Sequence, residues 1–196
     1  MKKILGIIMI SLLVLAGCGS SDFKAQTNWE IEEFEFDNQR GEETSLEDLK
    51  GTVWLATFIF TNCETICPPM TFNLAEIQGM LKDKGIEDYK IVGFSVDPEV
   101  DSPEKLQEYL DMFEVPDQSN WELLTGYSQE YISQLAEQAF KALVRNNPND
   151  DQVIHGSRFY LIDQNGIAVK NYTGYEDVPK EEIVIDMETL IEEGNK

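Results

Sequence analysis

Apolar positions along the chain alternate between continuous runs and helical spacing, which predicts alternating strands and helices. Residues 53–60 are a nearly continuous run of β-branched and aromatic residues, typical of a central strand buried on both faces. Pro68 and Pro69 follow, and apolar residues then recur at helical spacing until Gly85, which predicts a helix. Further strands are expected at 91–96, 121–124, 159–162 and 167–172, and further helices at 103–113, 128–140 and 181–191.

The segment before the central strand predicts an N-terminal hairpin. Apolar and polar residues alternate over 29–36, residues 38–41 have turn chemistry, and residues 44–51 read as a short capped turn. Residues 145–152 are polar and are expected to form a loop. The complete order is β, α, β, α, β, α, β, β, α. It predicts an α/β protein, a three-layer sandwich around one mixed sheet.

The N-terminus has the pattern of a bacterial lipoprotein signal. Lys2 and Lys3 precede an apolar run of about a dozen residues, and Leu15-Ala16-Gly17 leads directly to Cys18. We therefore expect a signal peptide over 1–17, a lipidated Cys18, a polar tether over 18–28 and one domain over 29–196. The apolar run is too short to favour the alternative, an uncleaved transmembrane anchor. The lipid would hold the protein on the extracytoplasmic side of the bacterial cell membrane.

The chain is strongly acidic. Its formal net charge is -22, and removal of residues 1–17, which contain two lysines and no acidic residue, makes it -24. Such a surface repels nucleic acid, so we expect no nucleic-acid partner. The carboxylates are explained either as a solvated surface that keeps the domain soluble or as a docking surface for a basic partner.

Two cysteines and one histidine are the candidate chemical groups. Cys63 and Cys67 lie between the expected central strand and the helix that follows, and His155 is the only histidine in the chain. At such a corner the positive end of the helix dipole is expected to lower thiol pKa values. Spacing alone allows a structural disulfide, a redox-active pair or two ligands of one metal ion. We expect His155 to pack beside this corner, because it lies in the loop before strand 159–162, the first strand of the final hairpin.

Two thiolates and one imidazole form a soft donor set. It suits Cu(I), it suits Cu(II) if an oxygen ligand is added, and it also suits zinc. Asp97 is a candidate weak or outer ligand, although an Asx-turn or a helix cap explains it equally well. Asp101 precedes Ser102-Pro103 and is expected to belong to the start of a helix.

Several of these segments together resemble the SCO/SenC family. They are residues 58–63, Cys67-Pro68, residues 95–98 with Asp101 and Pro103, and His155 with Ser157 leading into residues 160–163. The resemblance covers residues 29–191 and implies a thioredoxin-like, membrane-tethered copper protein that assists assembly of the binuclear copper site of cytochrome c oxidase subunit II. It implies Cys63, Cys67 and His155 as copper ligands, Cu(I) or Cu(II) as the metal, and subunit II as the partner, with another copper donor or a thiol reductant as a further partner.

Two residues depart from the pattern of many family members. Glu64 replaces a proline after the first cysteine, and Ile154 replaces an aspartate before the histidine. Neither change removes a ligand. They leave open how the imidazole is oriented and how the charge beside the thiols is balanced.

The same residues allow two other functions. In a thiol-disulfide oxidoreductase that keeps the partner's copper-ligand cysteines reduced, the more exposed Cys63 would attack and Cys67 would resolve. Ser157 occupies the position where thioredoxin-like reductases have a cis-proline, which counts against a general reductase. The remaining alternative is a redox or copper sensor that signals through a partner.

Overall fold

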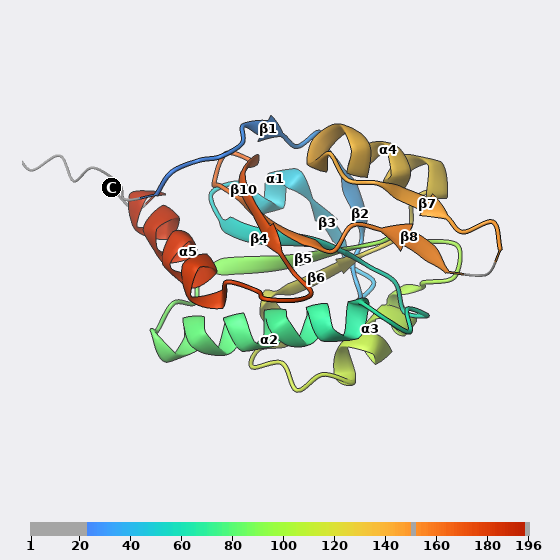
Figure 1. Ribbon diagram of the computed structural model, residues 1–196, viewed down its shortest axis with the longest axis horizontal. Helices are drawn as coiled ribbons and strands as arrows, with labels where there is room; N and C mark the ends of the chain where they lie inside the picture. The colour runs from blue at the N-terminus through green and yellow to red at the C-terminus, as the bar shows by residue number, and fades with distance from the viewer. Residues whose placement is uncertain (1–22, 150–151, 195–196) are drawn as a thin grey trace, which may run out of the picture.

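A six-stranded mixed sheet forms the centre of the molecule (Figure 1). The computed structural model describes residues 23–149 and 152–194. The strands of the sheet are β1 (Trp29–Glu30), β4 (Val53–Ile59), β5 (Tyr89–Ser95), β6 (Trp121–Leu124), β9 (Arg158–Ile162) and β10 (Ile167–Thr173). Their order across the sheet is β1-β10-β9-β4-β5-β6. Strands β4, β5 and β6 run parallel, whereas β9 is antiparallel to β4, and β10 pairs antiparallel with both β9 and β1.

Helices cover both faces of this sheet (Figure 1). One face packs against α2 (Cys67–Asp83), α3 (Pro103–Asp111) and α5 (Lys180–Gly194), and the other packs against α1 (Leu46–Leu49) and α4 (Gln129–Phe140). A single turn of 3₁₀ helix, η1 (Gln118–Asn120), leads into β6. The buried apolar residues accordingly divide into two clusters, one on each side of the sheet. The predicted three-layer α/β sandwich is confirmed.

The sequence around β4 and α2 explains why a strand ends and a helix begins at this point. All seven residues of β4 are buried, as expected for a central strand. Helix α2 starts at Cys67, and Pro68 and Pro69 occupy its first turn, where no intrahelical N–H bond is lost. The helix ends where Gly85 adopts a φ of 73°. Gly85 N–H then donates to the Lys82 carbonyl and Ile86 N–H to the Leu81 carbonyl, the two bonds of a Schellman motif.

The N-terminal hairpin is present but is shorter than predicted. Strands β2 (Glu35–Asp37) and β3 (Glu43–Ser45) pair antiparallel on either side of the expected turn. Trp29 belongs instead to β1 at the edge of the central sheet, opposite Ala168 of β10. Residues 29 and 30 therefore take no part in the hairpin, because they pair with β10, which is distant in sequence.

The prediction of a loop over 145–152 is wrong at its start. Strands β7 (Val144–Asn146) and β8 (Val153–His155) form a second hairpin outside the central sheet. Its register places Val144 opposite His155 and Asn146 opposite Val153. Each strand has only three residues, which is too few for a pattern of alternating polarity to be visible in the sequence. This hairpin carries the only histidine.

The predicted signal peptide (1–17), Cys18 and residues 19–22 of the predicted tether lie outside the described residues. Within residues 23–149 and 152–194, no helix is both long enough and apolar enough to cross a bilayer.

Candidate metal centre

The loop between β4 and α2 brings the two cysteines together. Cys63 N–H donates to the Phe60 carbonyl at 3.3 Å, which closes a turn directly after the strand. Cys67, the first residue of α2, donates its backbone N–H to Cys63 Sγ, also at 3.3 Å. The four-residue spacing is therefore used to aim an unsatisfied helix N–H at a sulfur atom. Both cysteines are free thiols.

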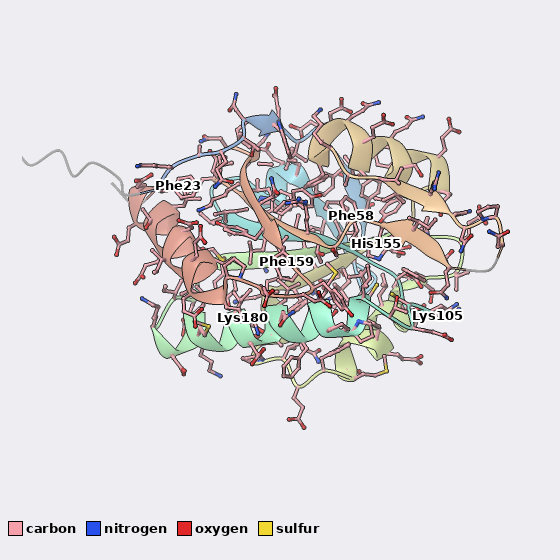
Figure 2. The ribbon with its side chains drawn as sticks, viewed as in Figure 1. Phe23, Phe58, Lys105, His155, Phe159 and Lys180 are labelled. Atoms are coloured by element: carbon pink, nitrogen blue, oxygen red, sulfur yellow. The ribbon has the colours of Figure 1, made fainter. Side chains whose placement is uncertain are left out.

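His155, the last residue of β8, completes the cluster. Its Nε2 lies 3.4 Å from Cys67 Sγ, and the ligand atoms of Cys63, Cys67 and His155 all lie within 4.8 Å of one another. Figure 2 shows His155 at the end of the β7–β8 hairpin, near the amino-terminal end of α2. The prediction that the imidazole packs beside the cysteines is confirmed.

The orientation of the imidazole does not depend on the side chain at position 154. His155 Nδ1 lies 3.0 Å from the Gly156 carbonyl, and the ring packs edge-on against Phe60 with centroids 5.8 Å apart. In the tautomer with the proton on Nδ1, that nitrogen donates to Gly156 and Nε2 has a lone pair for a metal ion. In the tautomer with the proton on Nε2, that nitrogen donates to a thiolate. Ile154, which replaces the aspartate of many family members, is 37% exposed. A backbone carbonyl therefore takes the position of an acceptor that a side chain could have supplied.

The segment after His155 is attached to the helix that carries Cys67. Gly174 N–H donates to the Ser157 carbonyl at 2.8 Å, and Asn73 of α2 donates through Nδ2 to the Gly174 carbonyl at 3.1 Å. A Cβ on Gly174 would lie only 2.8 Å from the Phe159 ring, so a side chain there would push the segments apart. Within residues 23–149 and 152–194 every peptide bond is trans, including the one at Ser157. Asn73 and Gly174 were not identified from the sequence, because their roles depend on contacts between distant segments.

Burial and hydrogen bonding separate the two thiols. Cys63 is 7% exposed and Cys67 is completely buried, so the predicted order of exposure is confirmed. Hydrogen bonds from the Cys67 thiol and, to a smaller extent, from His155 lower the pKa of Cys63 to about 3. Burial raises the pKa of Cys67, and the neighbouring Cys63 sulfur raises it further. The expectation that the helix dipole lowers both pKa values is thus wrong for Cys67, where burial has the larger effect.

Alkylation of the reduced, metal-free protein by iodoacetamide is expected to distinguish the two thiols. With a pKa of about 3, Cys63 is a thiolate throughout the range from about pH 5 to pH 8, so its rate should be nearly constant. The rate of an ordinary thiol, with a pKa of about 8.5, rises about tenfold for each unit of increase in pH until the pH reaches that pKa. Cys67 should remain unmodified because it is buried and protonated. Mass spectrometry of the two peptides gives the rates, and protein unfolded in guanidinium is the control. A tenfold rise per pH unit at Cys63 would contradict the assignment.

The two candidate aspartates lie outside this three-residue cluster. Asp97 lines a neighbouring hollow together with Asn62 and Gln152, and its N–H donates to Ser95 Oγ at 3.1 Å. Its role as an outer ligand remains a prediction. Asp101 lies at a helix start as predicted, directly before Ser102, whose Oγ caps α3. Its carboxylate takes no part in that cap, because it is 1% exposed and accepts from Thr61 and Ser95.

The described cluster offers two chemical possibilities. Two sulfur donors and one imidazole nitrogen can hold a soft metal ion, with a coordination position left for an incoming ligand. A thiolate next to a protonated thiol can also exchange with a disulfide. Both uses need access, which is provided by a hollow of about 360 Å³ whose lining includes Cys63, Ile66 and His155.

Comparisons of the sequence and of the structure with known proteins indicate the same family. The pattern of the SCO1/SenC family matches residues 24–192. A "SCO1 protein homolog" of Bacillus subtilis is 46% identical over 190 residues, which cover 96% of this chain and 97% of the relative. A SCO1/SenC family lipoprotein from Bacillus anthracis is 47% identical with a TM-score of 0.80, covering 85% of this chain and 98% of that structure.

Two further solved structures are similar. BsSco, described as a member of the Sco family of cytochrome c oxidase assembly proteins, is 47% identical with a TM-score of 0.79, covering 87% of this chain and 98% of that one. Bradyrhizobium japonicum ScoI with copper bound is 25% identical with a TM-score of 0.69, and the match covers 81% of this chain and 98% of that one. With nearly the whole chain matched in sequence and in fold, this protein belongs to the SCO1/SenC family.

Proposed function

We propose that this protein binds copper through Cys63, Cys67 and His155 and assists assembly of the binuclear copper site of cytochrome c oxidase subunit II. The observation that carries the proposal is the convergence of two sulfurs and one imidazole nitrogen within 4.8 Å. Thiolate donors favour Cu(I), and among divalent ions the Irving–Williams order favours copper over zinc. The copper bound to the related ScoI and the assembly role stated for the related BsSco support the same assignment.

The access to the ligands suits a site that exchanges its metal. Cys67 is completely buried, whereas His155 is half-buried and borders the hollow lined by Phe60, Ile66 and Ile154. A ligand from a partner can therefore approach from the imidazole side while the buried sulfur retains the ion. Stepwise ligand replacement of this kind moves copper without releasing it to water. Copper is here the cargo, and the partner provides the final ligands.

Membrane attachment belongs to the same proposal. A lipid on Cys18 and a tether over 18–28 would place the domain of residues 29–196 on the extracytoplasmic side of the cell membrane. The description of the related Bacillus anthracis protein as a lipoprotein supports this arrangement. A tethered chaperone would also meet a membrane-embedded oxidase at a high effective concentration.

Titration of the purified, reduced protein with Cu(II), followed by optical and EPR spectroscopy, tests the proposal. We expect a one-to-one complex with intense thiolate-to-copper charge transfer, because two sulfurs and one nitrogen are already gathered at one point. Protein whose Cys63 thiol has been blocked with iodoacetamide is the control. Rapid oxidation of both thiols without a stable complex would contradict copper binding as the function.

A second candidate function rests on the difference between the two thiols. Cys63 has the low pKa and the greater exposure of an attacking thiol, and Cys67 has the burial of a resolving thiol. In this reaction Cys63 would attack a partner disulfide and release one partner thiol. Cys67 would then attack Cys63 in the mixed disulfide, release the second partner thiol and leave the protein oxidised by two electrons. Reduction that persists without His155 would favour this alternative.

A further inference from the structure

The C-terminal ends of the three parallel strands meet at one residue, Asp101, whose carboxylate is buried. Thr61, which follows β4, donates its hydroxyl to Oδ1 at 2.6 Å, and its backbone N–H lies 3.2–3.3 Å from both carboxylate oxygens. Ser95, the last residue of β5, donates its hydroxyl to Oδ2 at 2.6 Å. Thr125, which follows β6, donates its hydroxyl to the Asp101 backbone carbonyl at 2.7 Å. Asp101 therefore joins the loop that leads to Cys63 to the ends of β5 and β6.

The hydrogen bonds around Asp101 match an ionised carboxylate. The Thr61 amide can only donate, and Ser95 Oγ already accepts the Asp97 N–H, which leaves its own hydrogen free for Asp101. Burial raises the pKa of Asp101, and the hydrogen bonds from Ser95 and Thr61 oppose that rise. Among the described residues no lysine or arginine forms an ion pair with it. Lys105 favours the charged form through space, but the groups in direct contact with the carboxylate are neutral donors. Burying a charge in this way is costly, so its presence requires an explanation beyond packing.

The position of Asp101 relative to the thiols suggests that explanation. Thr61 is two residues before Cys63, and two residues span at most about 7 Å of chain. The Phe60–Cys63 turn makes this segment more compact still. A unit charge about 10 Å from a metal ion interacts with it by roughly 2 kcal/mol at an effective dielectric constant of about 20, which corresponds to more than tenfold in an equilibrium constant. The carboxylate is thus close enough to affect which charge state of a bound ion is preferred.

We propose that Asp101 is a positioning residue that holds the Thr61–Cys63 segment in place for metal binding and whose negative charge favours Cu(II) over Cu(I). This inference rests on the proposed copper site. Oxidation of Cu(I) to Cu(II) adds one positive charge at the cluster, and a fixed negative charge nearby stabilises the more positive state. The hydrogen bonds orient the loop, and the charge sets the preference. Ser102-Pro103 predicted the helix start that follows Asp101, but nothing in the sequence indicated that the Asp101 carboxylate is buried.

The test compares the affinities of the wild type and Asp101→Asn for Cu(II) and, by competition with a Cu(I) chelator, for Cu(I). The variant keeps the shape and an acceptor oxygen, and Ser95 Oγ can accept from the new amide. We expect the ratio of Cu(II) to Cu(I) affinity to fall about tenfold. For a one-electron couple this equals a rise of about 59 mV in reduction potential. Asp101→Glu, which keeps the charge, should restore most of the ratio.

Matched variants separate charge from position. Thr61→Val and Ser95→Ala each remove one hydroxyl donor while Asp101 stays charged, so they should change both affinities together and leave the ratio within about twofold. If Asp101→Asn does not fold by circular dichroism, Asp101→Ser, which leaves space for water, provides the uncharged comparison. An unchanged ratio in the uncharged variant, with normal copper binding in the wild type, would overturn this inference alone. A wild type that binds no copper would overturn the proposed function and this inference with it.

Discussion

Replacement of His155 by alanine is expected to lower the affinity for Cu(II) by more than about 100-fold. Loss of the groups that merely orient a metal ligand costs about 10–100-fold in affinity, and loss of the ligand itself should cost more. His155 supplies the only imidazole of the chain, and its Nε2 lies 3.4 Å from Cys67 Sγ. The affinity for Cu(I) should fall less, because two thiolates alone are a favourable donor set for that ion. Equilibrium competition with chelators of known affinity measures both losses.

Ile154→Ala is the matched control for this experiment. Ile154 precedes His155 on the same three-residue strand but is 37% exposed and lies outside the ligand cluster. Its removal should leave both copper affinities within about threefold of the wild type. Equal Cu(II) affinity in His155→Ala and the wild type would refute the three-ligand site. If that variant also kept its ability to reduce a disulfide, the protein would be better described as a dithiol reductant.

Most of the central fold could be predicted because its elements have strong local signals. The strand over 53–60 is apolar throughout, and the helix after it begins with two prolines and ends at a glycine. These signals are properties of a few consecutive residues and do not depend on what lies nearby. The order of the elements then restricted the possible sheet arrangements, because parallel neighbours require a crossover connection.

The misassigned elements are those whose structure depends on distant partners. Trp29 was assigned to a hairpin, yet it pairs with Ala168, almost the whole domain away in sequence. Residues 145 and 146 were assigned to a loop, because a three-residue strand has no recognisable pattern. Both errors concern short edge strands, for which the backbone partner rather than the side-chain pattern decides the conformation.

The candidate site was predictable in its composition but not in its electrostatics. Cys63, Cys67 and His155 stood out because the chain has one histidine and only three cysteines. The sequence could not reveal that Cys67 would be completely buried and its pKa raised, since burial depends on the packing of the whole α2 face. It also gave no sign that the buried charge near the loop would come from Asp101.

Truncation of Phe58 to alanine is expected to lower the free energy of unfolding by about 3–5 kcal/mol. Phe58, on β4, is 1% exposed (Figure 2). Its ring contacts three others, with centroids 6.0 Å from Phe94, 5.3 Å from Phe140 and 6.2 Å from Tyr160. These rings join the sheet to α4. Removal of the central ring leaves a cavity, because the surrounding rings are held by different elements and cannot all move in to fill it. The loss is a large fraction of the roughly 5–15 kcal/mol that stabilises a typical domain. Chemical denaturation followed by circular dichroism measures it.

Phe72→Ala provides the comparison that assigns this loss to packing. The substitution is chemically identical, but Phe72 lies on the outer side of α2 and is 58% exposed, so its effect should stay within about 0.5 kcal/mol. A loss below about 1 kcal/mol in Phe58→Ala would mean that the sheet and α4 are not joined through this cluster. A large loss would have a functional consequence, because β4 leads through Phe60 to Cys63 while α4 packs against β7, the strand paired with the one that carries His155. The aromatic cluster would then be the part of the core that keeps the histidine hairpin beside the thiols.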